Sequence, residues 1–108
     1  MSSVPYKFTT TASTNLQPIR AGQTANITGI SVANVATAIY IKFYWTNSVI
    51  VGTTVPGMTI GVAASANVLQ MLPAITDNSS LWVAVTGAAA DSDTTSAAAG
   101  AVVTVFVE

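Results

Sequence analysis

The chain has 108 residues, of which 51% are hydrophobic and only 6% are charged, with a formal net charge of −1. An ordinary soluble domain carries roughly 25% charged residues, so the polar surface here must consist mainly of Thr, Ser, Asn and Gln. Its three cations cannot form a basic patch, which argues against nucleic acid as a partner. No apolar run approaches the ~20 residues of a membrane-spanning helix, and the first residues lack the apolar centre of a signal peptide. We therefore expect one small folded domain that binds neither nucleic acid nor a membrane.

The residue types needed for most catalytic sites are missing. The sequence contains no histidine and no cysteine, which removes the commonest general base, the thiolate nucleophile and nearly all transition-metal ligands. Asp91 and Asp93 flank Ser92, and this spacing could serve a calcium ion. A turn in which an Asp carboxylate accepts local hydrogen bonds is favoured, because calcium needs more oxygen ligands. From the sequence we expect a protein that is not an enzyme and that has no cofactor and no metal site.

Residues 1–14 predict an extended N-terminal arm, followed by a β-sandwich domain at residues 15–108. The run from Thr9 to Thr14 is polar, and alternation is limited to Tyr6 and Phe8. These two rings point to the same side of an extended chain, so they could anchor the arm to this subunit or to another one. A disordered tail and a docked arm both remain open.

Residues 25–32 predict a strand with an irregularity in its centre. The apolar phase slips between Ile27 and Ile30, and Gly29 lies at the slip. A β-bulge at this glycine would restore the alternation.

The strongest strand signal covers Thr37 to Trp45. Alternate residues form an apolar set, which predicts one face in a core: Ile39, Ile41, Phe43 and Trp45. The remaining chain is most economically organised around this strand.

Further strands follow at shorter intervals. Residues 58–62 alternate with Met58, Ile60 and Val62 inward, and residues 67–72 form a strand that Pro73 ends. A turn at residues 75–80 and a loop at residues 87–100 flank residues 81–86, whose two apolar faces predict a central strand or a subunit contact. Residues 101–107 alternate again. We expect an all-β fold of about six to eight antiparallel strands, a small β-sandwich or jelly roll.

The low charge also bears on association. Exposed sheet edges are normally protected by Lys, Pro or inward-pointing charges, and few charges are present here. We therefore expect self-association, with edges or faces covered by neighbouring subunits as in a trimer or a lattice. The alternative is a monomer that Thr hydroxyls keep soluble.

Five aromatic residues are candidate subunit or shell contacts: Tyr6, Phe8, Tyr40, Tyr44 and Trp82. The last three could instead form a platform on which a sugar ring stacks, but aromatic side chains are more often core or subunit contacts.

A family resemblance begins at Ala38. Residues 38–44 read Ala-Ile-Tyr-Ile-Lys-Phe-Tyr, and residues 51–60 combine Val-Gly-Thr-Thr-Val-Pro with Met-Thr-Ile. Residues 82–95 are the most specific block, because an aromatic strand is followed by Thr-Gly, Ala-Ala and Asp-x-Asp-Thr-Thr. In this order the sequence resembles a group of small tailed-phage virion proteins. The likeness covers about two-thirds of the chain and does not include the residues before Asn15.

The resemblance implies a β-sandwich structural protein of a bacteriophage particle, and specifically a capsid decoration (cement) protein. Such a protein would be made in the host cytoplasm, bind the major capsid protein on the capsid surface, and often form a homotrimer. A phage tail or fibre component, or a carbohydrate- or receptor-binding module, is the alternative.

Overall fold

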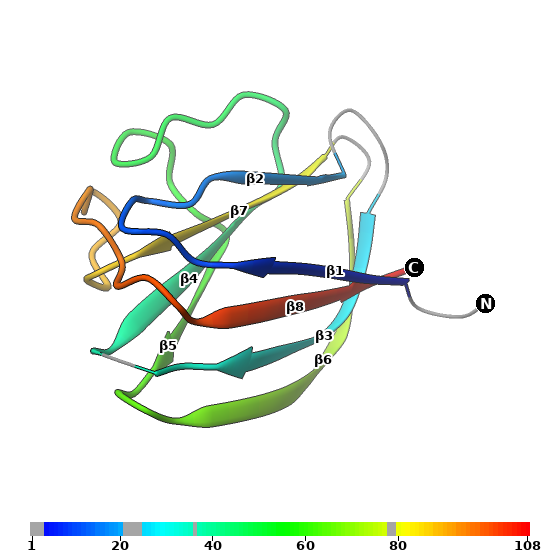
Figure 1. Cartoon of the computed structure of the whole chain (residues 1–108). Helices are drawn as coiled ribbons and strands as arrows, with labels where there is room; N and C mark the ends of the chain where they lie inside the picture. The colour runs from blue at the N-terminus through cyan, green and yellow to red at the C-terminus, as the bar shows by residue number, and fades with distance from the viewer. Residues whose placement is uncertain (1–3, 21–24, 36, 78–79) are drawn as a thin grey trace.

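The computed structural model describes residues 4–20, 25–35, 37–77 and 80–108. These residues form eight β-strands (Figure 1). The strands are β1 (Val4–Thr9), β2 (Gln17–Arg20), β3 (Ala25–Ala33), β4 (Ile39–Tyr44), β5 (Met58–Val62), β6 (Asn67–Asp77), β7 (Leu81–Thr86) and β8 (Val102–Val107). Within this described part of the chain, no helix is long and apolar enough to cross a membrane.

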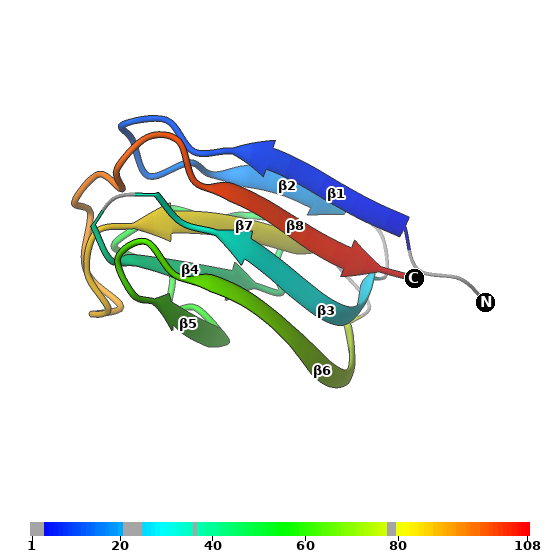
Figure 2. The ribbon, with the colours of Figure 1, turned by 60° about the horizontal axis from the view of Figure 1, so that its bottom comes forward.

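The strands form two antiparallel sheets of four strands each, in the orders β1-β8-β3-β6 and β2-β7-β4-β5. The first half of the chain pairs with the second half in nested order, because β1 pairs with β8, β2 with β7, β3 with β6 and β4 with β5. This is a long hairpin rolled into two layers, the arrangement of a jelly roll (Figure 2). The predicted all-β fold is confirmed.

The core lies between the two layers and includes the inner face of β4. Ile39, Ile41 and Phe43 are fully buried, opposite strand neighbours such as Val83 and Val85 on β7. Burying each such side chain contributes roughly 1.5–3 kcal/mol. The strand with the strongest sequence signal is therefore a central strand of the core, as is β7, whose two apolar faces predicted this position.

The predicted bulge in β3 is present. The register of β3 shifts between Ile27 and Gly29 against both of its neighbours, β6 and β8. Because of this extra residue, Ile27 and Ile30 are both fully buried despite their odd spacing.

Strand β6 continues beyond Pro73, which corrects the prediction that this proline ends it. β6 runs to Asp77, so residues 75–77 of the turn predicted at residues 75–80 are strand, and residues 78–79 lie outside the described part. β6 is an edge strand, and its register against β3 shifts between Met71 and Ile75. Proline is tolerated at such a position because an edge strand needs fewer N–H donors.

Of the two alternatives for the predicted N-terminal arm, the structure shows the docked one where it describes these residues, but as a strand of the sandwich and not as a separate arm. β1 pairs with β8 along its whole length, from Val4 opposite Val107 to Thr9 opposite Val102. The Thr10 amide then donates to the Ala101 carbonyl oxygen at 2.8 Å. Residues 4–14 are thus part of the sandwich, and no boundary separates them from the residues that follow. Residues 1–3 of the predicted arm lie outside the described part.

Proline occurs on three of the four edge strands, as Pro5 on β1, Pro18 on β2 and Pro73 on β6. β1 also carries Lys7. Both residue types block edge-to-edge pairing. Three edges are therefore better protected than the low charge suggested, whereas β5 carries neither proline nor a charged residue.

Candidate interaction surface

The outer face of the sheet β1-β8-β3-β6 is open to solvent. Figure 2 looks onto this sheet, and no described segment of the chain lies in front of it. Residues directly opposite each other in antiparallel strands share a face, so the register defines three rows across the four strands. These rows, which we call the open face, are Pro5-Phe106-Gly29-Met71, Lys7-Thr104-Ser31-Leu69 and Thr9-Val102-Ala33-Asn67.

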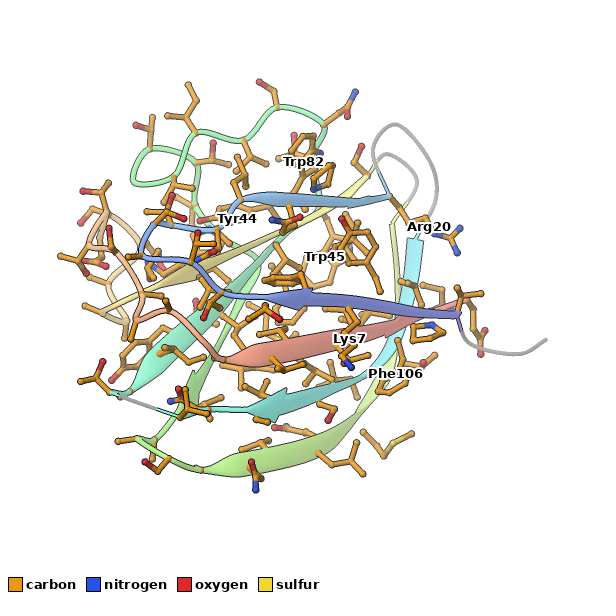
Figure 3. The ribbon with its side chains drawn as sticks, in the orientation of Figure 1. Lys7, Arg20, Tyr44, Trp45, Trp82 and Phe106 are labelled. Atoms are coloured by element: carbon orange, nitrogen blue, oxygen red, sulfur yellow. The ribbon has the colours of Figure 1, made fainter. Side chains whose placement is uncertain are left out.

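The open face is almost uncharged, and its bulky apolar side chains gather at one end of it. Leu69 is 72% exposed and Met71 is 76% exposed, the largest exposures of any bulky hydrophobic side chains that the structure describes. Phe106 is half-buried beside them. Lys7 is the single charged residue in the three rows and lies on the edge strand, as Figure 3 shows together with Phe106.

A hollow of about 200 Å³ lies in the open face, lined by Thr28, Gly29, Leu69, Met71 and Phe106. Gly29 forms part of its lining because the row Phe106-Gly29-Met71 lacks a side chain in the middle. A Cβ atom at Gly29 would lie 3.7 Å from both Met71 Sδ and Phe106 Cδ2, and 3.2 Å from the Gln70 carbonyl oxygen. The bulge glycine therefore keeps the hollow open.

The outer face of the second sheet differs, because the chain covers it. On this face Lys42, Tyr44, Ala84 and Thr86 are at most 1% exposed. The β7–β8 loop (residues 87–101) lies against them, and Lys42 Nζ donates a hydrogen bond of 2.6 Å to the Ala90 carbonyl oxygen. A buried ammonium needs such an acceptor, since burying a charge without a partner is costly.

Tyr44 and Trp82 are directly opposite each other on this covered face. The Tyr44 hydroxyl and the Trp82 Nε1 atom are buried and have no hydrogen-bond partner among the described residues. Burial raises the pKa of Tyr44, and the nearby Asp91 carboxylate raises it further. The phenol is thus held in its neutral form.

Asp93 closes a turn in the β7–β8 loop. Its Oδ2 atom accepts hydrogen bonds from the Thr95 hydroxyl at 2.7 Å, and from the backbone amides of Thr95 and Ala88 at 3.2 Å each. The Thr95 hydroxyl is the main cause of the lowered pKa of Asp93. The structure thus shows the turn role that the Asp91-Ser92-Asp93 spacing favoured. Among the described residues, no group of three His, Cys, Asp or Glu side chains could hold a metal ion.

The β4–β5 loop (residues 45–57) lies next to the β7–β8 loop. At Gly52 the backbone has a φ of +90°, and a Cβ atom there would collide with the Thr94 methyl group. Ile50 and Val55 on this loop are 63% and 70% exposed. In Figure 1 the loop lies at the top of the molecule, on the opposite side from β6.

The five aromatic residues predicted as contacts lie away from the open face. Tyr6 and Phe8 point from β1 toward the core, with ring centroids 6.4 Å apart, and the Tyr6 hydroxyl donates to Gln17 Oε1 at 3.3 Å. Tyr40 is half-buried over Gly61 on β5. Figure 3 shows Tyr44 and Trp82 away from the open face, with Trp82 beneath the β4–β5 loop.

This placement corrects the idea of an exposed aromatic platform. Tyr44 is 1% exposed, so Tyr40, Tyr44 and Trp82 cannot together stack on a sugar in this conformation. Sequence reasoning missed Leu69, Met71 and Phe106. A usable signal existed for Phe106, because it is a bulky aromatic residue in the phase opposite to the inward valines of its strand.

Comparisons with known proteins support the fold. No protein-family model matches the sequence, and no curated protein matches it. A solved structure from a study of Bacillus endospore appendages, described as a novel family of disulfide-linked pili, superposes with a TM-score of 0.52. The alignment covers 97% of this chain and 82% of that chain at 19% sequence identity. At this identity the match shows a shared fold.

Proposed function

We propose that this chain is a structural subunit of a bacteriophage particle, and specifically a capsid decoration (cement) protein on the capsid surface. The observation that carries the proposal is the open face, where Leu69, Met71 and Phe106 form an exposed apolar patch around the hollow in a protein whose other sheet is covered by its own chain. Contiguous exposed apolar surface of this kind marks an interaction site. A subunit of a permanent assembly would bury such a surface against its neighbours.

The phage assignment draws on the sequence resemblance. Its most specific block, residues 82–95, corresponds to β7 and the start of the β7–β8 loop. This block covers Lys42 and includes the turn closed by Asp93, so it has a clear structural role. Viral capsid proteins and lectins both use jelly rolls, and the fold by itself does not choose between them.

The mechanism of a cement protein follows from linkage. A protein that binds the assembled shell and not the free subunits adds its binding free energy to the stability of the assembled state. In this proposal the partner is the major capsid protein, the chain associates as a homotrimer, and contacts repeated by symmetry supply avidity. The chain would be made in the host cytoplasm and contributes no catalysis.

A second candidate is a fibre subunit, such as a phage tail or fibre component. It is favoured by the shared fold with a solved structure from the study of Bacillus endospore appendages described as disulfide-linked pili. This chain contains no cysteine, so its copies could not be joined by disulfides. The carbohydrate-binding alternative is less well supported, because Tyr44 is covered.

The test is co-sedimentation of the purified protein with expanded shells that lack it. We expect saturable binding with a fixed number of copies per shell. Electron microscopy of the protein alone tests the second candidate: regular filaments in the absence of shells would favour the fibre subunit, and absence of shell binding would overturn the decoration role.

A further inference from the structure

Two exposed apolar features lie at different places on the molecule. One is the hollow of the open face, with Gly29 in its lining. The other is the β4–β5 loop, on which Ile50 and Val55 extend into solvent. One feature is concave and the other projects, so a single copy carries both halves of a possible contact.

The projecting loop is held in a fixed shape. The amides of Thr53 and Thr54 donate to the Ile50 carbonyl oxygen at 3.0 and 2.8 Å, and the Ile50 amide donates to the Thr54 hydroxyl at 2.9 Å. The Gly57 amide donates to the Phe43 carbonyl oxygen at 2.8 Å, which fixes the end of the loop to β4. A loop already ordered loses little conformational entropy when it is bound.

The two features match in polarity and in size. Residues 45–57 contain no charged side chain, and neither do the residues that line the hollow. Their contact would therefore bury no unpaired charge. The hollow of about 200 Å³ is several times the ~30 Å³ occupied by one water molecule, which is enough room for a branched aliphatic side chain.

We infer that the β4–β5 loop of one copy of this chain binds in the hollow of a second copy. This inference rests on the proposed role as a structural subunit and names the partner of its open face. The contact joins two different surfaces, so each copy that receives a loop can offer its own loop to the next. Such a contact closes into a ring, as in a trimer, or continues as an open chain.

A contact between two open faces about a two-fold axis is the competing arrangement, and it leaves the loop free. Two double variants separate the arrangements: a loop variant, Ile50→Asp with Val55→Asp, and a hollow variant, Leu69→Asp with Met71→Asp. The matched control is Val35→Asp, which changes a 61% exposed valine on the β3–β4 connection. All five positions are more than 60% exposed, so the variants should fold, which circular dichroism and thermal melting check.

The experiment measures mass in solution by sedimentation velocity, for each protein alone and for an equimolar mixture of the loop and hollow variants. We expect wild type and control to associate, and each double variant alone to be monomeric. The mixture should form a 1:1 heterodimer, because the intact loop of the hollow variant meets the intact hollow of the loop variant. No larger species should form, since the other two surfaces are disrupted.

Three results would overturn the inference: a loop variant that associates like wild type, a mixture that stays monomeric, or a wild-type protein that is monomeric at every concentration tested. Shell binding, measured on the same preparations, keeps the two proposals apart. Wild-type protein that binds shells as a monomer contradicts the loop-in-hollow contact and leaves the decoration role. Wild-type protein that associates as expected but does not bind shells contradicts the decoration role and leaves the loop-in-hollow contact.

Discussion

Lys42 Nζ and the Ala90 carbonyl oxygen, 48 residues apart in the chain, are joined by a hydrogen bond of 2.6 Å. The lysine is fully buried on the outer side of β4, and this bond ties the β7–β8 loop to the sheet. A hydrogen bond to a charged group contributes about 1.5–3 kcal/mol, and removing one partner of a buried pair costs the desolvation of the other as well. The Lys42 ammonium therefore helps to hold the cover over the second sheet, together with the Thr86–Ser96 bridge and the hydrogen bond from the Thr86 hydroxyl to the Ala88 carbonyl oxygen.

We predict that Lys42→Ala lowers the free energy of unfolding by about 3 kcal/mol, because it removes this bond and leaves a cavity where the lysine stem was. Lys42→Met should cost less, since it fills the space. Urea unfolding measures both changes. Lys7→Ala, which removes an exposed cation from β1, is the control and should stay within about 0.5 kcal/mol of wild type. Equal losses for Lys42→Ala and Lys7→Ala would contradict the role of the buried ammonium.

Tyr44→Phe is expected to stabilise the protein by about 1 kcal/mol. The Tyr44 hydroxyl is buried and has no hydrogen-bond partner in the described part of the chain, so its removal relieves a desolvation cost without breaking a bond. Thermal and urea unfolding provide the measurement. Tyr40→Phe, at a half-buried site, controls for the loss of a hydroxyl in general. A loss of more than about 1 kcal/mol in Tyr44→Phe would mean that the hydroxyl has a partner.

Acid sensitivity should depend on Asp93. Hydrogen bonds, mainly from the Thr95 hydroxyl, lower the pKa of Asp93 from its ordinary value of 3.8. The unfolded chain therefore takes up this proton more readily than the folded protein does. The carboxylate contributes stability above its ordinary pKa, and this contribution is lost as the pH falls below it toward the folded value.

Melting temperatures of wild type, Asp93→Asn and Asp91→Asn between pH 7 and pH 2 check this expectation. Asp93→Asn should be less stable than wild type at pH 7 and should lose less stability on acidification. Asp91 accepts none of the three hydrogen bonds at Asp93 and serves as the control. Identical profiles of melting temperature against pH for wild type and Asp93→Asn would show that the Asp93 turn does not contribute to stability.

Deleting residues 1–9 should destabilise the sandwich. The deletion removes β1, exposes the paired edge of β8, and takes Tyr6 and Phe8 away from the core. We expect a drop in melting temperature of ~10 °C or more, together with aggregation through the new edge. Deletion of residues 1–3, which precede β1, is the matched control. An unchanged melting temperature after the longer deletion would mean that β1 is dispensable, as a separate arm would be.

The strands that sequence reasoning located best are those with a local signal. Alternation in residues 39–44 and 102–107 follows directly from burial of one strand face, and the phase slip around Gly29 required a bulge within the same strand. These features depend on neighbours a few residues away. A sequence contains them explicitly.

The features that were missed depend on pairing between distant parts of the chain. β1 was taken for an arm because its partner, β8, lies at the other end of the sequence. Pro73 was taken for a stop signal because the sequence does not show that β6 is an edge strand. The open face was missed for the same reason: coverage of a sheet face is decided by where loops fold back, and the β7–β8 loop happens to cover the second sheet.

Calorimetry of expanded shells tests whether the open face makes this chain part of an assembly. Shells are melted alone and after saturation with wild-type protein, the hollow variant (Leu69→Asp with Met71→Asp) or Val35→Asp. We expect wild type and Val35→Asp to raise the melting temperature of the shell equally, and the hollow variant to raise it much less. Shells that melt at the same temperature with and without wild-type protein, or that the hollow variant stabilises fully, would contradict this expectation.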